Sequence, residues 1–540
     1  MTSPIVDAGD DLPLTVPALL HQQAERFGDQ PFVVCDDHRL TYRDALEQSA
    51  VLARGLLAVG AGKGTHVGLL HPNEPDFVVG WLAAARIGAV ALPFSTFSKP
   101  AELTGLLGGA DVEVLLAARR YRSHHYEATL TAAVPGLDLG QPGPIQSVAL
   151  PALRRIAFAS ASPAVHLDHT AGSILAAAAE VGDDVLAAAE ADVTPADRMV
   201  IVHTSGSTSE PKGVVHAHGP LLRHLDNLNQ IRRYDSDDVL FANSPWFWIG
   251  GFAYALLGTL VAGARLVCSN AADAGGVLDV LERERPNVVN GFAAAIAHLP
   301  LDPSFADRDL SSIRRGNLWP LLPDDVRPAD SGLRHGMLGM TETASVCLLD
   351  DDGIDLPEHQ RGSFGRPAPG FETRILDADT GTPCAVGEIG VLWLRGPFLM
   401  EGYYGRERSE AFDPDGWFCT GDLFHVDADG LHYFHGRAGD MIKTAGANVS
   451  PREVEGVLSD AGIRAHVLGI DDADKGQLVA AAVVGDPASV DLDAVRALLD
   501  ERLSSYKVPK VFLVLEEDDV PMMSSGKLDA RALRERFDGR

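Results

Sequence analysis

HTSGSTSEPKGVVHAH, residues 203–218, follows an apolar run (MVIVHT, 199–204) that is typical of a buried strand. The centre of the stretch offers hydroxyls and backbone N–H groups that a ligand can approach closely: Thr204, Ser205, Gly206, Ser207 and Thr208. Lys212 adds a positive charge. Loops of this kind wrap phosphate oxygens, although the Walker A pattern is absent. Alone, the stretch would also fit a solvated turn, but PKG at this spacing after a strand favours an anion-binding loop.

The bulk composition limits the class of protein. The chain has 540 residues, a formal net charge of −30 and 46% hydrophobic residues, which predicts two or three domains of a globular enzyme. Nucleic-acid partners need clustered Lys and Arg, so the acidic balance argues against them. An anionic ligand would therefore need cations that are gathered locally.

The cysteines and the N-terminus indicate the cytoplasm. The five cysteines are scattered without a CxxC pair, so neither disulfides nor a zinc site is expected. The acidic start MTSPIVDAGDDLP has no apolar signal-peptide core. Residues 243–264 carry no charge and have the length of a membrane span, but one proline and four glycines interrupt them. We expect a buried turn and a core helix there, and no membrane span.

Alternating apolar runs and helical patterns predict an α/β fold with parallel strands. Residues 66–72 and 89–94 are expected to be buried strands, and 74–88 a helix between them. Runs at 239–245, 265–270 and 287–293 continue the alternation. The alanine-rich region 120–195 carries no motif and is expected to be variable and partly helical.

The composition changes near residue 435, where a smaller α+β unit is expected. Ser450, Pro451 and Glu453 have the N-cap, N1 and N3 spacing of a capping box. Residues 492–503 follow as an amphipathic helix with four leucine and valine side chains on one face. Short strands are expected at 465–470, 478–484 and 512–517, and the junction lies at about residues 436–440.

The stretch TSGSTSEPKG resembles the phosphate loop of the AMP-forming adenylating enzymes, the superfamily of acyl-CoA synthetases, luciferases and peptide-synthetase adenylation domains. Further motifs follow in the order of that superfamily: LTYRDAL (40–46), LGMTET (338–343), GEIGVLWLRGP (387–397), GYYG (402–405), GWFCTGDL (416–423), HGRAGDMIKTAGANVSPREVE (435–455) and PMMSSGKL (521–528). The pattern is most similar to acyl-CoA synthetases. It implies a large N-terminal multi-subdomain region, 1–436, and a small mobile C-terminal α+β domain, 437–540.

The resemblance implies two half-reactions with ATP (or a supplied acyl-AMP), Mg²⁺, CoA and a carboxylic acid. Lys527 would reach the carboxylate and the α-phosphate, Glu342 would help hold Mg²⁺, and Thr341 would line that site. Asp422 would accept both ribose hydroxyls, with Arg437 beside the ribose. The remaining contacts implied for the nucleotide and the thiol are the phosphate loop with Lys212, then Gly339, Lys443 and Gly446. Gly439 falls at the hinge about which the small domain rotates between the steps.

Four departures from the superfamily pattern bear on the substrate and on the first step. Ser209 replaces a glycine of the phosphate loop, and GNLWP (316–320) replaces a glycine-rich stretch near the adenine. Leu338 stands where an aromatic residue is common. Trp248 stands where amino-acid activators have Asp, so no carboxylate pairs with an α-ammonium group. Together, the predicted pocket favours a bulky apolar acid, with core packing of the aromatics as the alternative: Trp246, Phe247, Trp248, Gly250 and Leu338.

An ATP-dependent acid–CoA ligase is the leading hypothesis. Because three departures flank the nucleotide, a second hypothesis is a mainly thioester-forming ligase that takes acyl-AMP from a partner adenylating enzyme. A third is an adenylation protein that loads a carrier protein, and a fourth is a nucleotide-binding pseudoenzyme. The retained Lys527, Glu342, Asp422 and Arg437 argue against the fourth.

Overall fold

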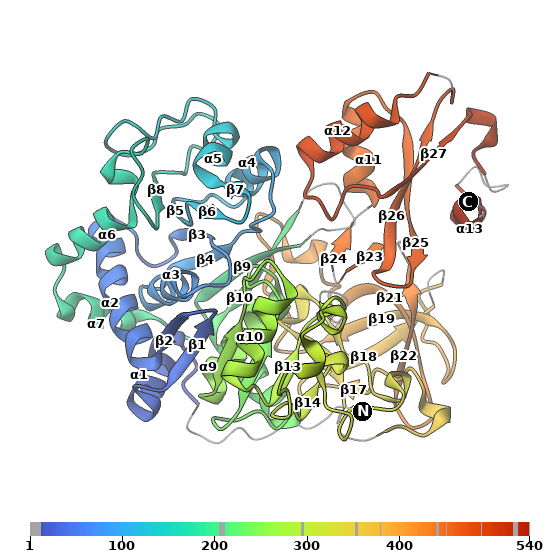
Figure 1. Ribbon diagram of the computed structural model, residues 1–540, viewed down its shortest axis with the longest axis horizontal. Helices are drawn as coiled ribbons and strands as arrows, with labels where there is room; N and C mark the ends of the chain where they lie inside the picture. The colour runs from blue at the N-terminus through green and yellow to red at the C-terminus, as the bar shows by residue number, and fades with distance from the viewer. Residues whose placement is uncertain are drawn as a thin grey trace.

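Two large sheets hold most of the predicted apolar strands, and a smaller unit at the C-terminus stands beside them (Figure 1). The structure is a computed structural model that describes residues 12–204, 211–292, 296–350, 355–377, 380–438, 442–445, 447–449, 451–487, 489–521 and 528–538. The mixed α/β architecture that the sequence predicts is confirmed.

The first sheet has seven strands in the order β20-β10-β9-β4-β3-β5-β8. Its strands from β9 to β8 are parallel, whereas β10 runs antiparallel to β9 and β20 runs antiparallel to β10. The bounds are β3 His66–Leu70, β4 Val90–Pro93, β5 Val114–Ala117, β8 Arg155–Phe158, β9 Arg198–Thr204, β10 Lys212–Ala217 and β20 Gly402–Tyr403. Strand β8, inside the alanine-rich region, was not predicted.

The second sheet has six strands in the order β14-β13-β11-β12-β1-β2. All neighbours are parallel except β1 and β2, which form an antiparallel hairpin. The bounds are β1 Pro31–Cys35, β2 His38–Thr41, β11 Val239–Ala242, β12 Arg265–Cys268, β13 Val288–Asn290 and β14 Arg315–Gly316. The three runs predicted between 239 and 293 each contain one of these strands.

Helix α3 (Pro75–Arg86) lies between the two sheets. It contacts β3 and β4 of the first sheet and β1 and β2 of the second. Ten of its residues, from Phe77 to Arg86, are buried, so the helix has no solvent-facing side. A helix that is apolar on all sides is stable only when it is enclosed, which explains its position.

Other helices cover the outer faces of the large region or connect its strands. They are α1 Val16–Phe27, α2 Tyr42–Ala58, α4 Pro100–Gly109, α5 Tyr126–Ala133, α6 Ala171–Ala177, α7 Asp183–Asp192, α8 His218–Ile231, α9 Gly258–Ala262 and α10 Ala274–Glu284. Short 3-10 turns are η1 Leu167–His169, η2 Ala178–Glu180, η5 Leu299–Leu301, η6 Phe305–Asp307, η7 Trp319–Leu321, η8 Ser331–Leu333, η9 Thr341–Thr343, η10 Glu358–Gln360, η11 Arg408–Glu410 and η12 Glu517–Asp519.

Smaller antiparallel sheets follow the second large sheet. A three-stranded sheet contains β15 Leu338–Gly339, β16 Val346–Leu349 and β17 Arg366–Pro367. A four-stranded sheet contains β18 Glu372–Leu376, β19 Gly390–Arg395, β21 Phe418–Val426 and β22 His432–Arg437. A two-stranded hairpin, β6 Arg120–Tyr121 with β7 His124–His125, precedes α5. Residue Thr341, which follows β15, lies next to β10, because its carbonyl accepts a hydrogen bond from His216.

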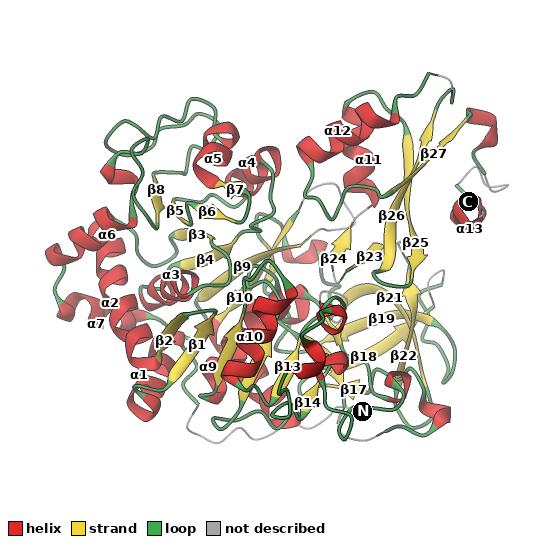
Figure 2. Cartoon of the chain, viewed as in Figure 1, coloured by secondary structure: helices red, strands yellow, loops and turns green. Residues whose placement is uncertain are grey.

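The C-terminal unit is built on one mixed sheet, β23 Ile442–Thr444, β24 Ala447–Val449, β25 Ala465–Asp472, β26 Gly476–Val484 and β27 Val511–Leu515. Helices α11 (Pro451–Asp460) and α12 (Leu492–Arg502) cover one face, and α13 (Ala530–Asp538) covers the other (Figure 2). The predicted boundary after residue 436 falls one residue before the end of β22.

In the capping box predicted for α11, Glu453 has an ionic partner. Its Oε1 accepts a hydrogen bond from Lys507 Nζ at 2.6 Å. Ser450, the predicted N-cap, lies outside the described residues. The predicted capping box therefore stays a prediction, because a carboxylate can bind a lysine and cap its own helix at once, as Glu102 of α4 does.

The uncharged stretch 243–264 is buried in the large region. It forms a turn, a π-helix at Gly250–Leu257 and then α9, as the turn-and-helix prediction required. No helix in the described part of the chain combines the length and the apolar character that a bilayer span needs.

In the described part of the chain, burial lowers the pKa of five histidines strongly. Burial lowers the pKa of His203, His216, His218 and His432 to about 4 and that of His224 to about 3. His224, on α8, packs against Phe371 and stacks on Phe398, with ring centroids 5.1 and 5.4 Å away. These imidazoles are neutral in the folded protein at pH 7.

We predict that the free energy of unfolding falls as pH is lowered from about 6.5 to about 4. In this window the histidines of the unfolded chain bind protons, whereas the buried histidines of the folded chain stay neutral. Lower pH therefore favours the unfolded state. His224→Phe should flatten the dependence by up to about 1.4 kcal/mol per pH unit, the value of one proton. Urea unfolding at several pH values measures this. His359→Gln, at an exposed position, is the control, and an unchanged slope in His224→Phe would contradict the assignment.

Candidate functional site

A cleft of about 890 Å³ lies where the large region meets the C-terminal unit. One wall comes from the ends of β9 and β10 and from η9, another from the residues around Trp248. The C-terminal unit contributes Lys443 and Ala447 of the β23–β24 hairpin and the segment after α12, Ser504, Tyr506 and Lys507. A cleft of this size accommodates a small-molecule ligand.

Antiparallel pairing of β9 and β10 forms the polar end of the cleft. In this register Lys212 lies opposite Thr204, and both residues line the cleft. The connecting residues Ser205, Gly206, Ser207, Thr208 and Ser209, which were predicted from the sequence, lie outside the described residues. Burial and nearby Arg406 lower the pKa of Lys212, and Glu342 and Glu410 oppose this shift.

Tyr403 contacts two of the predicted residues, Glu342 and Lys212. No role was assigned to Tyr403 from the sequence. Its hydroxyl donates a hydrogen bond to Glu342 Oε1 at 2.9 Å, and Lys212 Nζ lies 4.8 Å from its ring centroid. Strand β20 places Tyr403 there by pairing with Val214 of β10. The GYYG motif was a signal for this residue, but the 61 positions between Tyr403 and Glu342 hid the contact.

A buried histidine holds the backbone of η9. His216 Nε2, on β10, donates to the carbonyl of Thr341 at 2.7 Å. Ala344, at the end of the same turn, has a left-handed φ of 63°, a conformation that is uncommon outside glycine. Thr341, Glu342 and Gly339 all line the cleft, so this turn is fixed against β10 at the point where it meets the ligand space.

Aromatic side chains form the other end. Trp248 makes edge contacts with Phe247, Phe292 and Tyr506, whose ring centroids lie 5.3, 5.7 and 6.2 Å away. Phe247, Trp248 and Gly250 line the cleft, together with Tyr254 and Met337. This end is apolar and accommodates a hydrophobic group.

Two residues predicted for the acid pocket belong to the core instead. Trp246 is fully buried and packs against Phe77 at 5.5 Å, and Leu338 is 7% exposed within the main hydrophobic cluster. Their side chains do not line the cleft. Along an irregular turn the side chains of successive residues point in different directions, so residues 246 and 248 need not share a face.

Asn73 positions the aromatic turn and was not predicted. Its Nδ2 donates to the carbonyl of Ser244 at 2.9 Å, and its Oδ1 accepts from the N–H of Trp246 at 2.8 Å. The side chain of Asn73 therefore forms hydrogen bonds with the backbone on both sides of Pro245. Its own carbonyl accepts from Asn270 Nδ2 at 2.8 Å, which fixes it to the end of β12.

The other predicted residues have different positions relative to the cleft. Asp422 is 3% exposed and pairs with position 437 across β21 and β22, while its neighbour Gly421 lines the cleft. Lys443 lines it directly. The side chain of Arg437 and the residues Gly439, Gly446 and Lys527 lie outside the described residues. Leu528, next to Lys527, packs in the cluster that α13 forms on its face of the C-terminal sheet.

Oxygen ligands for a cation are present at the polar end. The carboxylate of Glu342 lines the cleft. Glu102 lines it too, but its carboxylate is paired with Lys507 and is not a ligand for the cation. Glu342 and Thr341 would suit a hard cation that takes its remaining oxygens from a phosphate. Elsewhere in the described ranges, His71, Glu74 and Asp76 bring ligand atoms within 4.8 Å of one another at the start of α3, away from the cleft lining.

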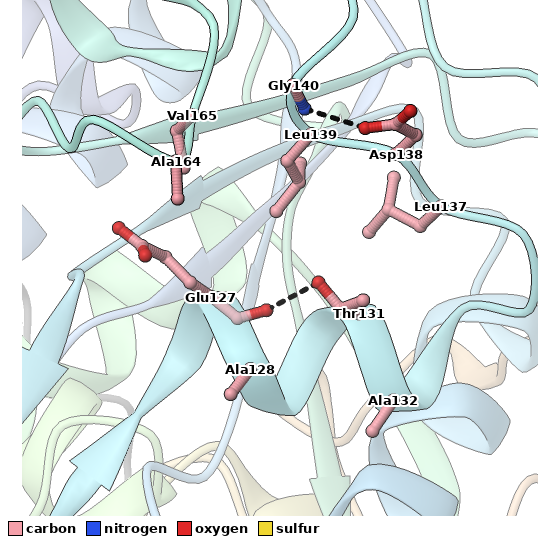
Figure 3. Close-up of a pocket in the computed structure, with 10 residues that line it drawn as sticks. All are labelled: Glu127, Ala128, Thr131, Ala132, Leu137, Asp138, Leu139, Gly140, Ala164 and Val165. Carbon is pink, nitrogen blue, oxygen red and sulfur yellow. Dashed lines mark hydrogen bonds between the residues drawn. The ribbon is translucent and has the colours of Figure 1, made fainter.

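A second hollow, of about 540 Å³, lies beside α5 (Figure 3). Small apolar side chains and the carboxylates of Glu127 and Asp138 line it. Asp138 Oδ1 is already bonded to the N–H of Gly140. None of the predicted site residues lies there, and the cleft remains the candidate site.

Comparisons with known proteins agree with the motif order. The profile of the AMP-binding enzymes matches residues 20–404, and that of the AMP-binding enzyme C-terminal domain matches residues 454–527. A feruloyl-CoA synthase from an Amycolatopsis species is 32% identical over 92% of this chain and 94% of its own. The sulfoacetate–CoA ligase of Cupriavidus necator is 29% identical over 95% and 96%.

The fold matches solved structures along its whole length. The o-succinylbenzoate CoA synthetase of Bacillus subtilis superposes with a TM-score of 0.74 at 24% identity, over 97% of this chain and 98% of that one. At this identity the likeness concerns the fold.

We predict that Asn73→Ala lowers the free energy of unfolding by about 2 kcal/mol, since two partly buried hydrogen bonds are lost. Urea unfolding followed by tryptophan fluorescence measures both the stability and the surroundings of Trp246 and Trp248. Asn227→Ala is the matched control: Asn227 is fully buried, and its side-chain amide has no hydrogen-bond partner in the described part of the chain. Equal losses of stability in the two variants would show that the hydrogen bonds of Asn73 on either side of Pro245 contribute nothing to the free energy of unfolding.

Proposed function

The chain belongs to the family of AMP-binding enzymes and is an AMP-forming acid–CoA ligase, and on this premise we propose that it converts a bulky apolar carboxylic acid to acyl-AMP and then transfers the acyl group to CoA. The observation that carries this proposal is the cleft with two unlike ends. Thr204, Lys212 and Glu342 line one end, and aromatic side chains line the other.

The aromatic end supports the choice of acid. Two relatives of similar identity are named for acids as different as ferulate and sulfoacetate, so kinship alone does not select the substrate. Phe247, Trp248, Tyr254 and Phe292 would bind an apolar or aromatic group and would leave the sulfonate of sulfoacetate without a partner. We therefore favour an acid that resembles ferulate over a small doubly charged one.

In the first half-reaction a carboxylate oxygen attacks the α-phosphorus of ATP, and the bond to the β-phosphate oxygen breaks to release pyrophosphate. Two anions must approach each other, so cations have to neutralise the charge that develops on the phosphate. Lys212 would contribute from β10, and Lys527 would reach the reacting carboxylate. Tyr403 would hold the Glu342 carboxylate toward the phosphates. When bound at Glu342, Mg²⁺ would screen the negative charge of the phosphates.

In the second half-reaction the CoA sulfur attacks the acyl carbonyl carbon, and AMP leaves with the electrons of the mixed-anhydride bond. The β23–β24 hairpin already reaches the cleft through Lys443 and Ala447. We propose that the thiol arm enters beside this hairpin. Asp422 and Arg437, on paired strands behind Gly421, would hold the ribose of the nucleotide.

A paired assay over a panel of acids tests the proposal. Ferulate, salicylate, octanoate, acetate and sulfoacetate are each supplied with ATP and Mg²⁺, and pyrophosphate release and CoA-thioester formation are followed side by side. We expect both products with the aromatic or medium-chain acids. Thioester only from supplied acyl-AMP would indicate dependence on a partner adenylating enzyme. Adenylate without transfer to CoA would point to a carrier protein, and no product at all would indicate a pseudoenzyme.

Lys527→Ala should reduce acyl-AMP formation by on the order of 10²-fold, because a cation that acts on developing charge is removed. Thioester formation from supplied synthetic acyl-AMP should change by less than about threefold, since the sulfur attacks the acyl carbon and no nucleophile attacks the phosphorus in that step. Rapid-quench measurement of each half-reaction separates the two effects. Lys510→Ala, which removes a lysine from the same unit outside the cleft, is the control. Equal losses in both half-reactions would contradict the role given to Lys527.

A further inference from the structure

A buried lysine links the C-terminal unit to the large region. Lys507 Nζ donates to Glu102 Oε1 at 3.0 Å and to Glu453 Oε1 at 2.6 Å. The lysine side chain is 9% exposed, and the two carboxylates are 11% and 8% exposed. Although burial lowers the pKa of Lys507, Tyr506 and the two carboxylates raise it above its ordinary value, so the ammonium group stays charged.

The two carboxylates differ in where they belong. Glu453 lies on α11 in the same unit as Lys507, so this pair moves as one body. Glu102 lies on α4 of the large region and also accepts from the hydroxyl of Ser504 at 2.7 Å and from its N–H at 3.3 Å. Helices α4 and α12 are in contact at the same place. The bonds to Glu102 exist only when the C-terminal unit is in the position seen here.

Because the bonds of Glu102 to Lys507 and Ser504 are buried, they favour the one position of the C-terminal unit in which they form. A charge-assisted hydrogen bond that is shielded from water is stronger than an exposed one, and a buried charge that loses its partner is unfavourable. If the C-terminal unit moved away, Glu102, Ser504 and Lys507 would each lose a partner and would have to be rehydrated. Glu453 would keep Lys507 in either case.

The position held in this way has a definite consequence for the cleft. It places Lys443 and Ala447 of the hairpin in the lining and brings Tyr506 against Trp248. Because the thiol arm is proposed to enter beside this hairpin, the position described is the one that serves the second half-reaction.

We propose that Glu102 is a positioning residue that holds the C-terminal unit, through Lys507 and Ser504, in the position that serves the thiol-transfer step. This inference rests on the proposed function, because it assigns one half-reaction to the position described.

Glu102→Gln is the informative variant. Glu102 also caps its own helix, since the N–H of Lys99 donates to its Oε2 at 2.9 Å. Glutamine preserves a capping box and the shape of the side chain and removes only the charge. Glu453→Gln is the matched control, because it removes a carboxylate from the same lysine without affecting the link between the two parts.

The first measurement compares the half-reactions, with feruloyl-AMP and CoA for the second step, or with the adenylate of whichever acid the panel selects. We expect Glu102→Gln to slow thioester formation about tenfold and to leave adenylation within about twofold. Glu453→Gln should affect both steps alike. Adding Lys507→Met to Glu102→Gln should cause little further loss of the second step, since the two changes break one link. Equal slowing of both steps by Glu102→Gln, or slowing of neither, would overturn the proposal.

The second measurement requires no substrate. Hydrogen–deuterium exchange of the ligand-free protein should show faster exchange in peptides that contain Ser504–Lys507 in Glu102→Gln, by at least about fivefold, with β25 and β26 unchanged. The same exchange rate as in the unmodified protein would overturn the link. If the panel gives no product, the proposed function fails, and the exchange experiment still decides whether Glu102 holds the two parts together.

Discussion

Strand β10 is the constraint on which the site depends. It pairs with β9 on one side and β20 on the other, so backbone hydrogen bonds fix three segments that are distant in the sequence. From this one strand Lys212 reaches the ring of Tyr403, and His216 holds the carbonyl of Thr341. The polar end of the cleft is therefore as rigid as the sheet, which is the arrangement that preorganised charge stabilisation requires.

The sequence predicted what local patterns determine. Apolar runs located β3, β4, β9, β11, β12 and β13, and the helical pattern between the first two runs located α3. Strand β8 was not predicted, because its four residues, RIAF, lie in a region without other sequence patterns that indicate a strand. Motif order identified the family, since several short signals in one order are far more specific than any one of them.

The errors and omissions have a common physical cause. Glu453 was predicted only as a capping residue, and its bond to a lysine 54 positions away was missed. Trp246 sits in an aromatic run, but the fold directs it to Phe77 and leaves Trp248 for the cleft. The side chains of Asn73, Tyr403 and His216 form hydrogen bonds with partners that are 61 to 173 positions away. Composition and spacing carry no information about such contacts, because the topology alone creates them.

The edge contact between Trp248 and Tyr506 joins side chains from opposite sides of the junction. An acyl tail that extended past Trp248 would occupy the space of the tyrosine ring and would keep the two parts from seating fully. Acids with longer tails would then bind well and react slowly. The enzyme would select chain length mainly through the rate of product formation and only weakly through its affinity for the acid.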